Sequence, residues 1–140
     1  MTNTQSIDTV KKLYDEAARL DVTIFWRKLY KYEAISSKDG CVVLDSTLFG
    51  NRERAILAHE LGHFISGAFY PIYCTIDDIA RAECRADRAA IKTFIPYTEL
   101  LTCLQKYMTP WEIANHFGLT VEAIQKAYYY YKDVMQLEFK

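Results

Sequence analysis

The five residues from 59 to 63 read H-E-L-G-H, and they have the types and spacing of a catalytic metal site. They lie inside a segment whose apolar pattern predicts a helix. Residues four apart on a helix share one face and are separated by about 6 Å along the axis, so the imidazoles of His59 and His63 can bind one cation. Glu60 projects beside that cation, where its carboxylate can take a proton from water. The motif therefore predicts metal-assisted hydrolysis with Glu60 as general base. The simpler alternative is that both histidines are ordinary packed or surface residues of a helix.

A third metal ligand is expected, because a catalytic zinc ion takes three protein ligands and keeps one position open for water. Cys74 is close to the motif in the sequence, but it falls in a predicted loop. Glu83 is favoured, since it lies 20 residues after His63 on the next predicted helix. Two helices joined by a loop can pack antiparallel, which would place Glu83 opposite both imidazoles.

Asp87 follows Glu83 by about one helical turn and shares its face. Its carboxylate can accept a hydrogen bond from a ligand imidazole and so fix the tautomer of that ring. The alternative for both acidic residues is a solvated helix face that is salt-bridged by the neighbouring arginines, namely Arg81, Arg85 and Arg88.

The elements that must position these residues are predicted to form an α+β fold. We expect a small, mostly antiparallel three-stranded sheet packed with about five to six helices. Asp39-Gly40, between two apolar runs, indicates a hairpin. Asn51 is the expected N-cap of the motif helix, and capping-box patterns begin at Thr75 and Thr109. The expected elements are a helix over 6–20, strands over 22–26, 32–36 and 41–45, and helices over 51–65, 75–96, 98–108, 109–118 and from 120 onward.

The composition is that of an ordinary globular protein. The chain has 140 residues, of which 51% are hydrophobic and 25% charged, and its net charge is -1. This excludes a disordered tail and a generally basic DNA-coating protein. There is no apolar stretch of membrane-spanning length, and the polar N-terminus does not read as a secretory signal. The four cysteines form no C-x-x-C pair and are expected as free, buried thiols, so we expect a cytoplasmic protein without a membrane partner.

The motif and its surroundings resemble the ImmA/IrrE family of small metallo-endopeptidases, compact relatives of the thermolysin-like gluzincins. The resemblance covers most of the chain and rests on residues 41–47, 57–63, 83–96 and 113–123. It implies zinc on His59, His63 and Glu83, with Glu60 as general base and acid. Many members carry a second acidic residue where this chain has Arg85, which leaves Glu83 as the carboxylate at that turn.

Gluzincins also often use a tyrosine or histidine to support the oxyanion beside the metal. Tyr70 and Tyr73 lie between the motif and Glu83, so both are candidates for that role. The more ordinary interpretation is that both are packing or loop residues.

The resemblance implies a zincin-like metallopeptidase core over 1–97, followed by a helical extension over 98–140. Ala114, Gly118 and Ile124 have the spacing of a helix-turn-helix. Several family members are paired with a helix-turn-helix repressor that they cleave or antagonise. The expected partner is therefore a protein substrate, a DNA-binding repressor of a phage or mobile element.

Direct nucleic-acid binding is not expected, because the last predicted helix offers Gln125, Lys126 and four tyrosines but no arginine. The alternative function is a non-proteolytic regulator. Such a protein would bind a protein or DNA partner through the C-terminal helices and would use the metal for structure.

Overall fold

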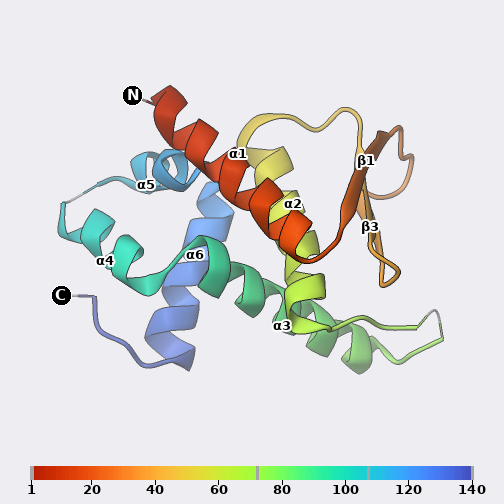
Figure 1. Cartoon of the computed structure of the whole chain (residues 1–140). Coiled ribbons are helices and arrows are strands. Elements are labelled where there is room, and N and C mark those ends of the chain that lie inside the picture. Colours follow the sequence, from red (N-terminus) through yellow and green to blue (C-terminus); the bar gives the residue numbers. More distant parts are fainter. Residues whose placement is uncertain (1, 72, 107, 140) are drawn as a thin grey trace.

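The computed structural model describes residues 2–71, 73–106 and 108–139, with side chains from residue 8 onward. In the described part of the chain there are six α-helices and one three-stranded sheet, which confirms the α+β class. The sheet lies at one end of the molecule and the C-terminal helices at the other, with α2 and α3 between them (Figure 1). The elements are α1 (Thr2–Arg19), β1 (Thr23–Arg27), β2 (Ala34–Ser37), β3 (Cys41–Asp45), α2 (Gly50–Ser66), α3 (Ile76–Phe94), α4 (Tyr97–Gln105), α5 (Pro110–Phe117), α6 (Val121–Tyr129) and a π-helical turn, η1 (Tyr130–Val134).

The sheet is mixed and has the order β1-β3-β2. Strands β2 and β3 form the expected antiparallel hairpin, whose turn ends at Gly40 with a φ of 106°. A residue with a Cβ rarely adopts such a φ. Strand β1 joins the other side of β3 in parallel, with Thr23 beside Cys41. Strand β2 is therefore an edge strand, and Val42 and Leu44 of the central strand are fully buried against the helices.

Helices α2 and α3 form the pair that carries the predicted site. Helix α3 begins at the expected capping box, in which the Thr75 hydroxyl accepts from the amide of Asp78 and the Asp78 carboxylate accepts from the amide of Thr75. The expected N-cap of α2 was wrong: the helix begins at Gly50 after Phe49, which makes no side-chain cap. The side chain of Asn51 instead donates to that of Asn115 on α5 at 3.0 Å, so a tertiary contact replaces the local cap.

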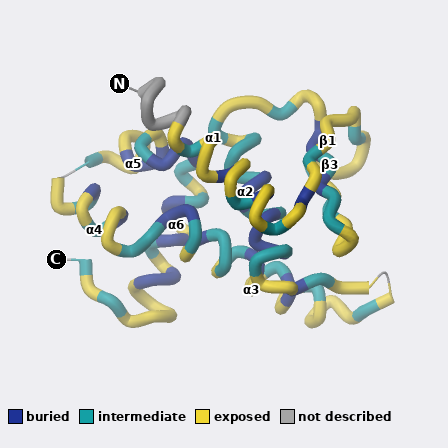
Figure 2. Tube along the Cα trace, in the orientation of Figure 1, coloured by how far each residue is buried: buried dark blue, intermediate teal, exposed yellow. Residues whose placement is uncertain are grey.

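The C-terminal helices pack against the rest of the chain. Helix α5 opens with the expected capping box of Thr109 and Glu112 and ends at Gly118, which has a φ of 68°. Helix α5 contacts α1, and α6 contacts α3. In the tyrosine run after residue 127, Tyr130 and Tyr131 are buried whereas Tyr129 is exposed. Figure 2 shows the buried positions on the inward-facing sides of these helices.

The structure bears on two of the expectations about compartment. None of the helices in the described part of the chain has the length and apolar composition that a membrane span requires. The four cysteines are free thiols, but the expectation that all are buried was wrong: Cys103 is buried and Cys84 is exposed. Cys84 lies on α3, directly after Glu83.

Gly62 allows α2 and α3 to approach closely. A Cβ at this position would lie 2.1 Å from the carbonyl oxygen of Ala86, a backbone atom that can move only if α3 moves. In an uncrowded helix, glycine to alanine stabilises by about 0.5–1 kcal/mol. Here we expect Gly62→Ala to destabilise the metal-free protein by about 3 kcal/mol, because overpacking outweighs that gain.

The matched control is Gly67→Ala, at a position with a φ of 68° where a Cβ would meet nothing within 4 Å. Its expected cost is only the strain of the left-handed conformation, about 1 kcal/mol. Urea unfolding of both variants measures the difference. Equal costs would contradict the proposed close contact at Gly62.

Candidate metal centre

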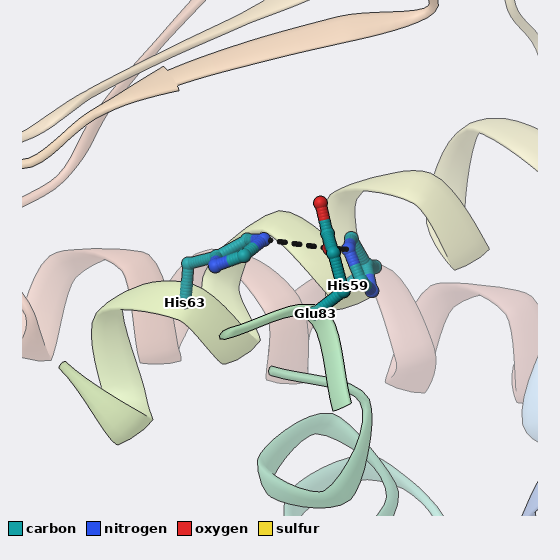
Figure 3. Close-up of side chains that lie close together, drawn as sticks. All are labelled: His59, His63 and Glu83. Atoms are coloured by element: carbon teal, nitrogen blue, oxygen red, sulfur yellow. Dashed lines mark hydrogen bonds and ion pairs between the residues drawn. The ribbon is translucent and has the colours of Figure 1, made fainter. Parts of the chain in front are cut away.

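Three side chains converge where α2 crosses α3. His59 and His63 come from one face of α2, and Glu83 faces them from α3 (Figure 3). The Oε2 atom of Glu83 lies 2.6 Å from Nε2 of His59 and 3.1 Å from Nε2 of His63. The three potential ligand atoms all lie within 4.8 Å of one another. Two nitrogens and one oxygen are thus presented toward a common point.

The outer nitrogen of each imidazole is held by a hydrogen bond. Nδ1 of His59 donates to Oδ1 of Asp87 at 2.7 Å, and Nδ1 of His63 donates to the carbonyl oxygen of Ala68 at 2.6 Å. Because Nδ1 of each ring is used as a hydrogen-bond donor, Nε2 is the nitrogen that remains to bind a metal ion. Asp87 therefore lies where the sequence analysis placed it, as a partner of a candidate ligand.

The residues that follow α2 contact two of the three converging side chains, His63 and Glu83. Gly67 ends the helix in the left-handed region and turns the chain so that the Ala68 carbonyl faces His63. The ring of Phe69 packs on His63 with centroids 5.8 Å apart. The hydroxyl of Tyr70 donates to Oε1 of Glu83 at 3.2 Å. Tyr73, the other tyrosine singled out in the sequence, is 94% exposed.

The hydrogen bonds dominate the electrostatics of the metal-free site. Burial disfavours a charged imidazole, but the bonds to Asp87 and Glu83 outweigh it and raise the pKa of His59 to about 10. The pKa of His63 is also raised, because its bonds to Glu83 and Ala68 outweigh burial. The bonds from both histidines hold the pKa of Glu83 far below its usual range. Without metal, protons on the two rings therefore supply the positive charge that a cation would bring.

These pKa shifts predict how stability depends on pH in the metal-free protein. His59 has a folded pKa above its ordinary value of 6.5, so its stabilising contribution is complete below about pH 6.5 and is lost as pH rises toward 10. Glu83 has a lowered pKa, so its contribution is present above its ordinary value of 4.5 and is lost at lower pH. We expect maximal stability between about pH 4.5 and 6.5.

Unfolding free energies of chelator-treated protein, measured from pH 4 to 10, check this expectation. His59→Gln should flatten part of the alkaline decline, leaving the part due to His63. Stability that rises from pH 6.5 to 9 in the wild type would contradict it.

Glu60 directly follows His59 on α2 and is not one of the three residues whose atoms converge. It is half-buried, and its negative charge helps to raise the pKa of both histidines. With His59 and Asp87, it also lines a cavity of about 450 Å³. The walls of this cavity come from four parts of the chain, and their exposed area is more apolar than polar. The apolar residues are Ala34 of β2, three residues of α2 (Ala55, Ile56 and Ala58), four residues at the end of α3 (Ala90, Ile91, Phe94 and the following Ile95), and Leu119 and Ala123 around the start of α6. Charged residues, among them Glu33, Arg52, Glu122 and Lys126, complete the lining.

The donor set fits a divalent metal ion. Two imidazole nitrogens and one carboxylate oxygen suit zinc, and they would also accept manganese, iron or cobalt. Two Nε2 atoms that face one carboxylate oxygen, with both Nδ1 atoms fixed, form a set that a cation can occupy by displacing two protons. A helix carrying this pair, crossed by a helix carrying the carboxylate, defines a candidate metallohydrolase centre.

The comparison with known families agrees with this class. The model of peptidase family M78, described as the IrrE N-terminal-like domain, matches residues 17–129. The chain therefore belongs to that family, and the resemblance seen in the sequence is confirmed. The matched range contains the histidine pair, Glu60, Glu83 and Asp87. No curated protein matches the chain.

Some contacts of the site had no signal in the sequence. The carbonyl of Ala68 fixes His63, but any residue type can supply a carbonyl. Only Gly67, as a helix-ending residue, indicated that the chain turns back there. The contact from Lys126 on α6 to Oδ2 of Asp87, at 3.5 Å, joins segments 39 residues apart and was likewise not foreseen.

Proposed function

We propose that this chain is a zinc-dependent endopeptidase that cleaves a specific protein. The observation that carries the proposal is the convergence of His59, His63 and Glu83, with Glu60 beside them, in a member of a peptidase family. These three residues would hold zinc, and the bound ion would supply a Lewis acid for activating water and polarising a peptide carbonyl.

The chain's own residues divide the remaining work. Glu60 accepts a proton from the attacking water and passes it to the amine that leaves. Asp87 and the Ala68 carbonyl keep the two imidazoles oriented, so that both Nε2 atoms face the same point throughout. The cavity beside Glu60 leaves room for a substrate side chain.

The surroundings of the cavity favour an extended peptide as the substrate. Ala34, the first residue of the edge strand β2, and the two residues before it, Tyr32 and Glu33, line the cavity together with His59 and Glu60. An edge strand can pair with an extended peptide through its free backbone groups, while alternate side chains of the peptide enter pockets. The apolar walls suit a hydrophobic side chain next to the bond that is cleaved.

The substrate that we propose is a helix-turn-helix repressor encoded near this chain, as the resemblance to the ImmA/IrrE proteins suggests, in the cytoplasm of a cell that carries a phage or mobile element. The C-terminal helices support a protein partner more than DNA. Helix α6 has one basic residue, Lys126, which is paired with Asp87. Leu119 and Ala123 contribute to the cavity wall, so this part of the chain would contact a bound substrate.

The experiment is to incubate the zinc-loaded chain with the repressor encoded beside it and to identify the fragments by mass spectrometry. One specific cut that requires zinc and Glu60 supports the proposal. Stable binding without a cut, unchanged when zinc is removed, would favour the non-proteolytic regulator. If that repressor is not cut, sequencing of new N-termini in a cell lysate treated with the chain tests the endopeptidase activity apart from the substrate.

A further inference from the structure

The two carboxylate oxygens of Glu83 have different partners. Oε2 faces Nε2 of both histidines, whereas Oε1 accepts the hydroxyl of Tyr70 at 3.2 Å. We propose that Tyr70 is a positioning residue that keeps Oε1 away from the metal, so that Glu83 binds through one oxygen only. The inference rests on the proposed zinc site and assigns a role to a residue outside the ligand set.

The physical reason lies in the number of positions around the ion. A carboxylate can bind a metal through one oxygen or through both. A catalytic zinc ion with three protein ligands needs its fourth position for water. If both oxygens of Glu83 bound the ion, the second would compete with that water. A hydrogen-bond donor on Oε1 removes this possibility before any substrate arrives.

Tyr70 is itself held by the segment that fixes His63. The Ala68 carbonyl accepts from His63, and Phe69 packs between His63 and Phe64, with centroid distances of 5.8 and 4.9 Å. The Tyr70 ring lies edge-on to the His63 ring, with centroids 6.4 Å apart. The residues from 67 to 70 therefore form one short clamp that orients two of the three candidate ligands.

This role differs from that of an oxyanion donor. A tyrosine that stabilises only the transition state leaves the resting metal site unchanged when its hydroxyl is removed. A tyrosine that positions Glu83 changes the resting site even without substrate. The two roles can therefore be separated in protein that contains metal and no substrate.

The test compares Tyr70→Phe with Tyr73→Phe, which removes the same hydroxyl from a 94% exposed side chain of the same loop. Each protein is loaded with zinc for X-ray absorption and with Co²⁺ for visible spectroscopy. We expect the wild type and Tyr73→Phe to give a four-coordinate site. Tyr70→Phe should show one additional oxygen neighbour and weaker Co²⁺ bands, because the second oxygen of Glu83 joins the ion.

Equal melting temperatures of the metal-free proteins would show that Tyr70→Phe preserves the fold, and partial exposure of Tyr70 favours this result. A four-coordinate spectrum in Tyr70→Phe identical to that of the wild type overturns the inference, even if cleavage is lost. The proposed function does not depend on that result: it stands as long as the wild type binds zinc and cleaves. A wild type that binds no metal overturns both.

Discussion

Glu60→Gln is expected to abolish cleavage while the metal stays bound. Glutamine has the shape of glutamate, but its amide cannot accept a proton from water or pass one to the leaving amine. General acid–base catalysis contributes about 10²–10⁴-fold to a rate, so we expect kcat/KM to fall by at least about a hundredfold. The zinc content should not change, because Glu60 lies beside the three convergent atoms and is not one of them.

The measurement is kcat/KM on the identified substrate, with zinc per chain determined on the same samples. Glu53→Gln is the matched control, because Glu53 lies in the first turn of the same helix, about two turns before His59. It should cleave like the wild type. If the Glu60→Gln variant keeps full activity, Glu60 is not the general base. A variant that loses its zinc would show that Glu60 helps to hold the metal.

Glu83→Ala is expected to lose the metal. It removes the oxygen that both imidazoles face and leaves two ligands, too few for a catalytic zinc site. Substitutions that only disturb a partner of a ligand cost about 10–100-fold in metal affinity, so removal of the ligand itself should cost more than about a hundredfold. His63→Ala should have an effect of the same order.

Competition with a chelator of known affinity measures these losses. Glu122→Ala and His116→Ala are the matched controls, since they remove the same residue types from α6 and α5. Both should bind zinc as the wild type does. The zinc affinity of Asp87→Asn should lie between that of the controls and that of Glu83→Ala, because this variant weakens the hydrogen bond that orients His59 without removing a ligand.

The placement of the motif and of the third converging side chain could be predicted because helical spacing is local. The sequence positions of His59 and His63 fix their relative placement once the segment is helical. The position of Glu83 needed only one further assumption, that the next helix returns antiparallel across the first. Asp87 then follows from the same helix. The structure brings all four residues together as this reasoning requires.

What could not be predicted depends on contacts between distant parts of the chain. Strand β1 pairs in parallel with β3, and no turn between two neighbouring strands specifies that pairing. Asn51 had the residue type of an N-cap, but a tertiary hydrogen bond to Asn115 took its side chain. The close approach at Gly62 is a contact with the backbone of α3, and a glycine inside a helix does not by itself show which backbone lies against it.

If His59, His63 and Glu83 together hold one catalytic metal ion, elemental analysis of chelator-free protein will detect that ion. Wild type and Glu83→Ala would be purified side by side, supplied with zinc and freed of unbound metal. We expect close to one zinc ion per wild-type chain and a sharp loss in Glu83→Ala. A wild type without metal after zinc is supplied, or a Glu83→Ala variant that keeps the full content, would contradict it.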